Sequence, residues 1–201
     1  MLRILFREID RAVKGPAIFI DRDGVINCRR HGDYVLDWSQ FIFMPGIRKA
    51  LKQLSSLGLP MIIISNQAAI GKGLLDLVGL QEITAQMERT LAADGTFLAA
   101  VYYCTHRTDE NCICRKPKPE LLYRAADDFN IDLSRSIFIG DSETDVQAAR
   151  AAGCRPVLLD SDGDAGPGSS QWKMDLAIAL TPHALFQVAA KCLADEIRVV
   201  R

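Results

Sequence analysis

Short apolar runs alternate along the chain with longer segments in which apolar and polar positions recur at helical spacing. The apolar runs occupy residues 17–21, 60–65, 99–104, 136–141, 155–160 and 175–180. They are nearly continuous in hydrophobic residues, which is typical of strands that are buried on both faces of a parallel sheet. The pattern therefore predicts a strand in each run.

The amphipathic segments between these runs predict helices. In residues 46–58, Ile47, Leu51 and Leu54 lie at helical spacing, and Gly58 marks the end of the segment. The same reasoning predicts helices at residues 76–95, 119–130, 143–153 and 181–198. A proline near the start or a glycine after the end marks most of these boundaries.

The alternation of strands and helices predicts one α/β domain over residues 1–201, with an open parallel sheet covered by helices on both faces. No large insertion follows the first strand or lies between the second and third strands, so we expect no large cap domain. Residues 1–15 form an N-terminal extension without a functional interpretation, and residues 161–170 form a loop rich in glycine and serine.

Composition and charge narrow the classes of partner. The chain has 24 basic and 25 acidic residues, and this net charge of -1 provides no electrostatic footprint for nucleic acid or an anionic membrane. No apolar run approaches the roughly 18 residues of a membrane span. Charges interrupt the first fifteen residues, which lack the apolar core of a signal peptide. We therefore expect a cytoplasmic protein, and we expect it to be a monomer.

Polar side chains gather where the predicted strands end. Asp21 and Asp23 follow the first strand, residues 65–67 follow the second, and Asp141 closes the fourth. Lys116 lies in the long loop after the third strand. Because the carboxyl ends of parallel strands share one edge of a sheet, which is where ligands bind, these groups are predicted to form one site.

The residue types at this edge suit phosphoryl transfer. Asp21 is ionised at neutral pH and can attack a phosphate without a base. The attack is opposed by charge repulsion, so it requires Mg²⁺, for which Asp141 can supply a second carboxylate, and a cation such as Lys116. Ser65 can donate to the phosphate. Asp23 can protonate the leaving oxygen and then activate the hydrolytic water.

Four short motifs extend this interpretation. "DRDGVIN", "SNQ", "RKP" and "GDSETD" occur in this order on alternating strands and helices, and they resemble the four motifs of the haloacid dehalogenase (HAD) superfamily of phosphatases. Longer stretches such as "SNQAAIGKG", "CICRKPKPELL" and "IGDSETDVQAARAAG" are similar to the D-glycero-D-manno-heptose 1,7-bisphosphate 7-phosphatase / histidinol-phosphatase family. The similarity covers residues 17–159 and implies a Rossmann-like HAD fold.

The resemblance implies a role for each matching residue. Asp21 is expected to be the nucleophile and Asp23 the acid/base, and the Mg²⁺ ligands are expected to be Asp21, the backbone carbonyl of Asp23, and Asp141. Ser65 and Lys116 are expected to hold the transferring phosphoryl group, and Arg115 to reach the remaining groups of the substrate. Gly24, Asn27, Asn66 and Gln67 are further predicted substrate-binding residues, and Lys72 is compatible either with binding a second phosphate or with a simple surface position. Ser142 and Asp145 are expected to lie behind the metal ligands, although Asp145 is equally compatible with a plain helix N-terminal acid.

Two positions depart from the resembled family. Ser65 occupies a position where the heptose enzymes usually have threonine, and this exchange keeps the hydroxyl group. Ser142 follows Asp141 where family members often carry lysine, so a cation is absent there. In the loop after the first strand, His31, Asp33 and Tyr34 are compatible either with contact to the substrate or with a simple surface loop.

A second cluster combines cysteine and histidine. Cys104, His106, Cys112 and Cys114 lie within residues 104–114, and four such ligands suit a closed tetrahedral Zn²⁺ site. In the resembled family this segment is a structural zinc loop, which would direct Arg115 and Lys116 toward the phosphate. Thiols without a ligand are the alternative interpretation. The other cysteines are scattered along the chain.

These patterns favour a Mg²⁺-dependent phosphomonoesterase that acts through an aspartyl-phosphate on a small phosphorylated metabolite. The 7-phosphate of D-glycero-D-manno-heptose 1,7-bisphosphate is the expected target, and histidinol phosphate or another small sugar phosphate is the alternative. Two other classes remain open. A receiver-like signalling domain would carry a long-lived phosphoaspartate, which Asp23 disfavours, and a zinc-based nucleic-acid-binding module is disfavoured by the neutral charge.

Overall fold

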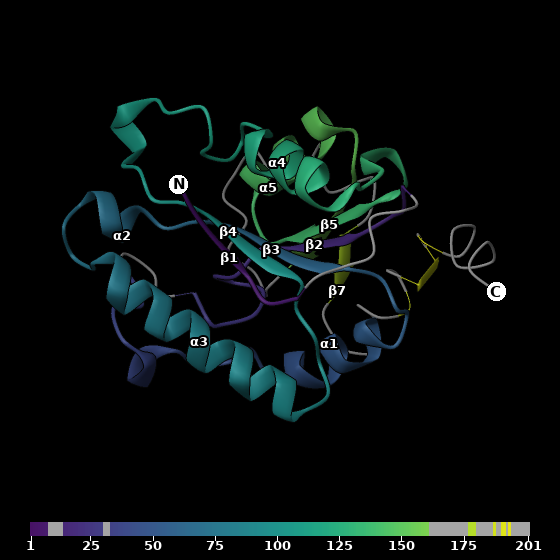
Figure 1. Ribbon diagram of the computed structural model, residues 1–201, viewed down its shortest axis with the longest axis horizontal. Helices are drawn as coiled ribbons and strands as arrows, with labels where there is room; N and C mark the ends of the chain where they lie inside the picture. Colours follow the sequence, from purple (N-terminus) through teal and green to yellow (C-terminus); the bar gives the residue numbers. More distant parts are fainter. Residues whose placement is uncertain are drawn as a thin grey trace.

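The computed structural model describes residues 1–7, 14–29, 33–160 and 177–179, together with residues 187, 190, 191 and 193. Its described strands form one sheet in the order β1-β4-β3-β2-β5-β6-β7 (Figure 1). Their bounds are β1 Leu2–Leu5, β2 Ile18–Ile20, β3 Met61–Asn66, β4 Ala100–Cys104, β5 Ile137–Gly140, β6 Arg155–Asp160 and β7 Ala177–Ala179. Strands β2 to β7 pair in parallel, which confirms the predicted parallel α/β architecture.

Strand β1 was not predicted from the sequence. It pairs with β4 in the antiparallel direction, with Leu2 opposite Tyr103 and Leu5 opposite Ala100, so the sheet is mixed at this edge. Alternate residues of β1 are half-buried and exposed, as in an edge strand with one face on the core. The strand is short and carries Arg3 in its interior, so its sequence pattern is weak. Part of the N-terminal extension thus completes the sheet.

The predicted helices before residue 160 are present within a few residues of their expected bounds. They are α1 Ile47–Ser55, α3 Leu77–Ala93, α4 Glu120–Phe129 and α5 Glu143–Ala152. The short helix α2 Ala68–Gly71 was not predicted, because four residues are too few to show a helical period. The bounds of the helix predicted at 181–198 lie outside the described residues, as does the loop at 161–170.

Helices cover both faces of the sheet. Leu51 of α1 and Met87 of α3 belong to one buried cluster, together with Ile18 and Ile20 of β2. Phe19, which lies between those two isoleucines, points to the opposite face and joins a second cluster with residues of α4 and α5. The strands are therefore apolar at successive positions because each face is covered (Figure 1).

The register of the parallel strands brings the predicted site residues to one edge. Ile20 at the end of β2 pairs with Ile63 of β3 on one side and with Ile139 of β5 on the other. The residues at the carboxyl ends of β2, β3 and β5 therefore leave the sheet at nearly the same level. This places Asp21 between Ser65 and Asp141.

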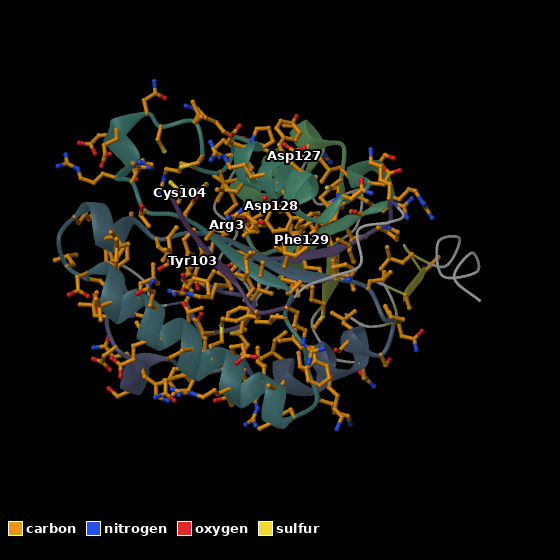
Figure 2. The ribbon with its side chains drawn as sticks, viewed as in Figure 1. Arg3, Tyr103, Cys104, Asp127, Asp128 and Phe129 are labelled. Atoms are coloured by element: carbon orange, nitrogen blue, oxygen red, sulfur yellow. The ribbon has the colours of Figure 1, made fainter. Side chains whose placement is uncertain are left out.

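Side chains fasten strand β1 to the rest of the molecule. Arg3 Nη1 lies 2.7 Å from Asp128 Oδ2 on α4, and the Tyr102 hydroxyl donates to the same oxygen at 2.5 Å. Figure 2 shows Arg3 close to Asp128. The ammonium group of Met1 donates to Thr105 Oγ1 at 3.2 Å, beside the cysteine-rich segment. The described part of the N-terminal extension therefore packs against the edge of β4 next to that segment.

The segments that follow β2 and β3 carry no inserted domain in the described part of the chain. The first contains the single-turn helix η1 Trp38–Gln40, and the second contains only α2 before α3 begins. The remaining short turns are η2 Thr108–Glu110 and η3 Leu133–Arg135. This agrees with the prediction that no large cap covers the site. Among the described residues, no helix has the length and apolar character needed to cross a bilayer.

Burial on the helical face predicts the effect of truncating a core leucine. Leu51 of α1 has no exposed surface, whereas Leu77 at the start of α3 is 48% exposed. We expect Leu51→Ala to lower the free energy of unfolding by about 2–5 kcal/mol. The matched exchange Leu77→Ala should change it by less than about 1 kcal/mol. Urea denaturation measures both, and equal losses would contradict the assignment of α1 to the core.

Candidate active site

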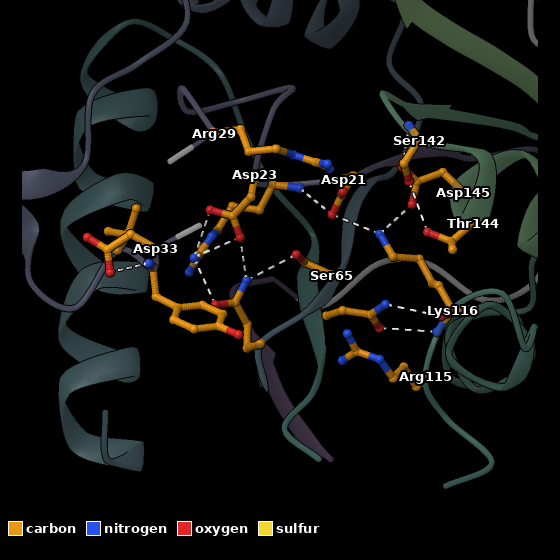
Figure 3. Close-up of a pocket in the computed structure, with 15 residues that line it drawn as sticks. Asp21, Asp23, Arg29, Asp33, Ser65, Arg115, Lys116, Ser142, Thr144 and Asp145 are labelled. Carbon is orange, nitrogen blue, oxygen red and sulfur yellow. Dashed lines mark hydrogen bonds and ion pairs between the residues drawn. The ribbon is translucent and has the colours of Figure 1, made fainter. Parts of the chain in front are cut away.

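A pocket opens at the carboxyl edge of the sheet, where β2, β3 and β5 end (Figure 3). Of the predicted site residues, it is lined by Asp21, Asp23, Ser65, Asn66, Gln67, Arg115, Lys116, Ser142 and Asp145. Further lining residues are Arg22, Arg29, Asp33, Tyr34, Val35 and Thr144. Gly24, Asn27, Lys72 and Asp141 do not line the pocket. Asn27, Lys72 and Asp141 contact the lining residues Asp23, Tyr34 and Arg29, respectively, and Gly24 lies against Asp141.

A buried ion-pair triad forms the centre of the pocket. Lys116 Nζ lies 2.8 Å from Asp21 Oδ1 and 2.7 Å from Asp145 Oδ1, and all three side chains are at least 90% buried. The ammonium group also donates to the carbonyl oxygen of Ile64 on β3 at 2.9 Å. Burial opposes the charge on Lys116, but the two carboxylates outweigh it and raise the pKa of the lysine. The amine therefore stays charged next to Asp21.

The backbone of Lys116 is fixed by Asn66. The Asn66 side chain accepts from the Lys116 amide at 3.1 Å and donates to the Lys116 carbonyl oxygen at 3.2 Å. This reciprocal pair ties the loop after β4 to the end of β3. The predicted phosphate-binding residue Asn66 thus holds the main chain that carries the lysine, in addition to lining the pocket.

Hydrogen bonds at the start of helix α5 fix the orientation of the Asp145 carboxylate. Its Oδ2 accepts from the amides of Asp141 and Ser142 at 3.2 and 3.1 Å, and from the Ser142 hydroxyl at 2.6 Å. A Cβ at Gly140 would lie 2.3 Å from the Asp145 Cβ, so glycine is required for this approach. Asp145 therefore caps α5 with one oxygen and pairs with Lys116 through the other. The pairing with Lys116 was not predicted from the sequence.

Asp23 lies in a network of nitrogen donors. Arg22 Nη2 is 3.0 Å from each Asp23 oxygen, Gln67 Nε2 is 2.7 Å from Oδ2, and Asn27 Nδ2 is 2.9 Å from Oδ1. Burial acts to raise the pKa of Asp23, but the Arg22 charge and these donors outweigh it and lower that pKa. In Figure 3 the Asp21 carboxylate lies between Asp23 and Lys116.

Asp141 lies behind the pocket in an environment that requires a cation. Its Oδ2 would be 1.8 Å from a Cβ at Gly24, whose φ of +93° also favours glycine, so the motif glycine allows this carboxylate to approach. Arg29 Nη2 pairs with Asp141 Oδ1 at 2.8 Å. Burial and the Asp21 charge raise the pKa of Asp141 to about 7, and burial raises that of Asp21 to about 6.

These acids fit a divalent metal ion. One carboxylate oxygen from each of Asp21, Asp141 and Asp145 can be chosen so that the three atoms lie within 4.8 Å of one another. An all-oxygen ligand set suits Mg²⁺. Since Asp145 is already engaged with Lys116 and Ser142, Asp21 and Asp141 are the carboxylates left for the ion. The raised pKa values of Asp21 and Asp141 express their burial first and repulsion from neighbouring carboxylates second, and a bound cation would offset both.

Lys72 and its neighbours lie at the rim of the pocket. The Lys72 amine sits 5.2 Å from the centre of the Tyr34 ring, and Tyr34 and Asp33 line the pocket. Lys72 therefore contacts the aromatic ring of a residue that lines the pocket, and it does not line the pocket itself. His31 lies outside the described residues, so the structure does not place it.

The cysteine and histidine side chains of the loop after β4 converge on one point. Cys104 Sγ is 3.5 Å from Cys112 Sγ and 3.7 Å from His106 Nδ1, and Cys114 Sγ is 3.3 Å from the same nitrogen. Ligands around a tetrahedral Zn²⁺ lie about 3.5–3.8 Å apart, given its bond lengths of about 2.0–2.3 Å. Burial raises the pKa of Cys104 to about 12, which a cation would reverse. The donor set fits zinc.

Two charged pocket residues were missed from the sequence. Arg22 and Arg29 flank the first motif, and an arginine between or beside acids is most simply interpreted as a solvated ion pair. In the structure, however, Arg22 is only 1% exposed. The only sequence signal was its position directly after a fully buried strand, where the chain enters the site.

Comparison with known proteins identifies the family. A model described as haloacid dehalogenase-like hydrolase matches residues 4–153, three quarters of the chain. The chain belongs to the haloacid dehalogenase-like hydrolase family. The match confirms the superfamily that was expected from the four motifs, and it confirms the predicted hydrolase class.

Curated relatives cover most of this HAD-like hydrolase. The D-glycero-beta-D-manno-heptose-1,7-bisphosphate 7-phosphatase of Helicobacter pylori strain J99 is 40% identical over 144 residues, which is 71% of this chain and 82% of the relative. The protein of the same name from Vibrio cholerae is 35% identical over 185 residues, covering 86% of this chain and 97% of the relative.

A solved structure shows the same architecture. The D,D-heptose 1,7-bisphosphate phosphatase from B. bronchiseptica, crystallised with magnesium and phosphate, superimposes with a TM-score of 0.75 at 30% identity. The alignment covers 90% of this chain and 99% of that one. This HAD-like hydrolase therefore shares both sequence and fold with proteins named as heptose bisphosphate phosphatases.

The buried acids predict how stability depends on pH in buffer without Mg²⁺. The folded-state pKa values of about 6 for Asp21 and about 7 for Asp141 lie above the unfolded value of about 3.9. Between these limits the native state binds more protons than the unfolded state, so this contribution lowers stability as pH rises from 5 to 8. Asp141→Asn removes one such group. We expect its stability relative to the unmodified protein, measured by urea denaturation, to increase across this interval. A constant difference would contradict the raised pKa of Asp141.

Proposed function

We propose that this protein is a Mg²⁺-dependent phosphomonoesterase that forms an aspartyl-phosphate on Asp21. We further propose that it removes the 7-phosphate of D-glycero-D-manno-heptose 1,7-bisphosphate. The observation that carries the proposal is the buried Asp21 carboxylate, held 2.8 Å from Lys116 on the wall of the pocket. A carboxylate next to a fixed cation is suited to receive a phosphoryl group whose negative charge the cation offsets.

The orientation of Asp21 favours attack by one oxygen. Its Oδ1 accepts from Lys116 Nζ and from the Arg22 amide, both at 2.8 Å. These two donors fix the plane of the carboxylate before a substrate arrives, which reduces the entropy to be lost on reaching the transition state. Lys116 and the Ser65 hydroxyl lie where they can contact the oxygens of the transferring group.

Asp21, the backbone carbonyl of Asp23, and Asp141 are the groups proposed to hold Mg²⁺. When bound, the ion would neutralise the phosphate oxygens and so permit an anion to attack them. The related B. bronchiseptica structure, which contains magnesium and phosphate, supports magnesium as the ion. Gly24 leaves room for Asp141 at this position, and Asp145 holds the Asp141 amide through its Oδ2.

Asp23 is proposed to move the proton in both halves of the reaction. It would protonate the leaving oxygen of the ester, and then take a proton from the water that hydrolyses the phosphoaspartate. Its side chain is 28% exposed, so it remains reachable from the pocket despite its three donors. A group that hydrolyses the phosphoaspartate so close to the acceptor argues for an enzyme and against a receiver domain.

The rim of the pocket supports a phosphorylated sugar as substrate. Arg115 and Arg29 supply positive charge, and Asp33 and Tyr34 supply hydrogen-bonding groups. Arg115 Nη1 is buried and has no hydrogen-bond partner among the described residues, so a second anionic group on the ligand would satisfy it. The names of the relatives specify the β anomer, which makes that anomer the first substrate to test.

A phosphate-release screen tests this proposal. With Mg²⁺ present, both anomers of the heptose bisphosphate, histidinol phosphate and common sugar phosphates are compared at equal concentration. We expect the highest kcat/KM for the β anomer, and we expect Asp21→Asn to lower kcat by at least about 10³-fold. A preference for histidinol phosphate would replace the proposed substrate. Full activity of Asp21→Asn would exclude the proposed nucleophile.

We also propose that Cys104, His106, Cys112 and Cys114 hold a structural Zn²⁺, because all four positions come from the protein. Lys118 supports the loop, since its amine donates to the carbonyl oxygens of Asn111 and Cys112 at 3.1 and 2.7 Å. The loop leads directly into Arg115 and Lys116, so an ordered zinc site would fix the approach of both cations.

Metal analysis of protein purified without chelators tests the zinc site. We expect one equivalent of zinc per chain, a loss of most of it in Cys112→Ser, and a lower melting temperature for that variant. Cys28→Ser is the matched control, because Cys28 lies outside the cluster. Absence of zinc from the unmodified protein would contradict the assignment, as would an equal loss in both variants.

A further inference from the structure

We propose that Arg22 is a positioning residue for proton transfer, because its guanidinium group fixes the orientation of both Gln67 and the acid/base Asp23. The inference rests on the role of Asp23 proposed above. It goes further by assigning a task to the guanidinium group of the residue between the two aspartates, which has no direct contact with the phosphate in the proposed reaction.

Arg22 is the largest side chain of the described residues that is almost fully buried. Its Nε and Nη1 have no hydrogen-bond partner there, and the nearest aromatic ring is that of Tyr103, 5.7 Å from the guanidinium carbon. Burying a cation with unpaired donors lowers stability, and an apolar side chain of similar size would avoid that loss. An unfavourable group at the mouth of an active site points to a functional requirement.

A single nitrogen of the Arg22 guanidinium makes the contacts with both Asp23 and Gln67. Nη2 lies 3.0 Å from each oxygen of Asp23 and 2.8 Å from Gln67 Oε1. Gln67 Nε2 in turn lies 2.7 Å from Asp23 Oδ2 and 3.1 Å from Ser65 Oγ. The arginine, the glutamine and the aspartate therefore form a closed ring of contacts, and Gln67 extends the ring to the proposed phosphate site.

The ring depends on Arg22 because a guanidinium group can only donate hydrogen bonds. Its presence requires the oxygen of the Gln67 amide to face Arg22, so the NH₂ group must face Asp23 and Ser65. Without Arg22 the amide can turn over, and its oxygen would then face the Asp23 carboxylate. The Asp23 side chain would lose two of its three donors and could rotate away from the leaving group.

Asn27 distinguishes this arrangement from simple charge neutralisation. Its Nδ2 donates to Asp23 Oδ1 at 2.9 Å and to the carbonyl oxygen of Cys28 at 3.1 Å, so it anchors one side of the carboxylate. With only Oδ1 anchored, the Asp23 carboxylate could still rotate about its side-chain bonds. The Arg22 and Gln67 contacts to Oδ2 remove that freedom. They fix the direction in which the Asp23 carboxylate faces, in addition to its position.

A comparison of leaving groups tests the inference. A sugar alkoxide leaves only with a proton from Asp23, whereas p-nitrophenolate leaves readily without one. For Asp23→Asn and Arg22→Met we therefore expect kcat/KM to fall about 10–100-fold with the heptose bisphosphate and less than about threefold with p-nitrophenyl phosphate. The double variant should be no slower than Asp23→Asn, because Arg22 acts through Asp23. Arg22→Lys, with three donors on one nitrogen, should recover part of the loss.

Melting temperature and zinc content establish that each variant is folded. If Arg22→Met does not fold, Gln67→Met replaces it, because that exchange leaves the buried Arg22–Asp23 pair in place; it should show the same preferential loss with the sugar ester. Equal losses with both esters, or losses that add to that of Asp23→Asn, would show that Arg22 is only structural. Full activity of Asp23→Asn with the sugar ester would instead remove the proposed role of Asp23.

Discussion

The burial of the Lys116 ammonium group between Asp21 and Asp145 is the interaction on which the site depends. Three charged side chains leave water together, and this is tolerable only because each is paired at 2.7–2.8 Å and further bonded to the main chain. The pairing joins β2, the loop after β4 and the start of α5, which are distant in sequence. It thereby fixes Asp21, Lys116 and the start of α5 as one unit.

The remaining charges of the pocket are arranged around this triad so that one cation is still required. Lys116 balances only part of the charge of Asp21 and Asp145, and Asp141 has Arg29 as its sole cationic contact among the described residues. The raised pKa of Asp141 reflects this shortage. Asp23, by contrast, has its own arginine and a lowered pKa. Asp23 and Asp141, which come from different motifs, thus have opposite pKa shifts because of their surroundings.

Much of this arrangement could be predicted because the strands are short, apolar and parallel. Asp21 and Asp141 each follow such a strand and Ser65 lies near the end of one, and parallel strands must present these positions at one edge. The close spacing of Cys104 and His106 and of Cys112 and Cys114 likewise limits where their side chains can go. Strand β1 could not be predicted, since its four residues carry a charge in their interior and are ordered only by pairing with β4.

The sequence by itself determined the alternation of elements, the family motifs and the residue types at each strand end, because these follow from local periodicity and spacing. Only the tertiary structure decided which groups meet. It assigned Asp145 to Lys116, placed Asp141 against Gly24, and buried Arg22 between Asp23 and Gln67. Such choices depend on distances between side chains from separate elements. An arginine between two aspartates has the same letter code whether it faces solvent or the core, and only folding around it makes the difference.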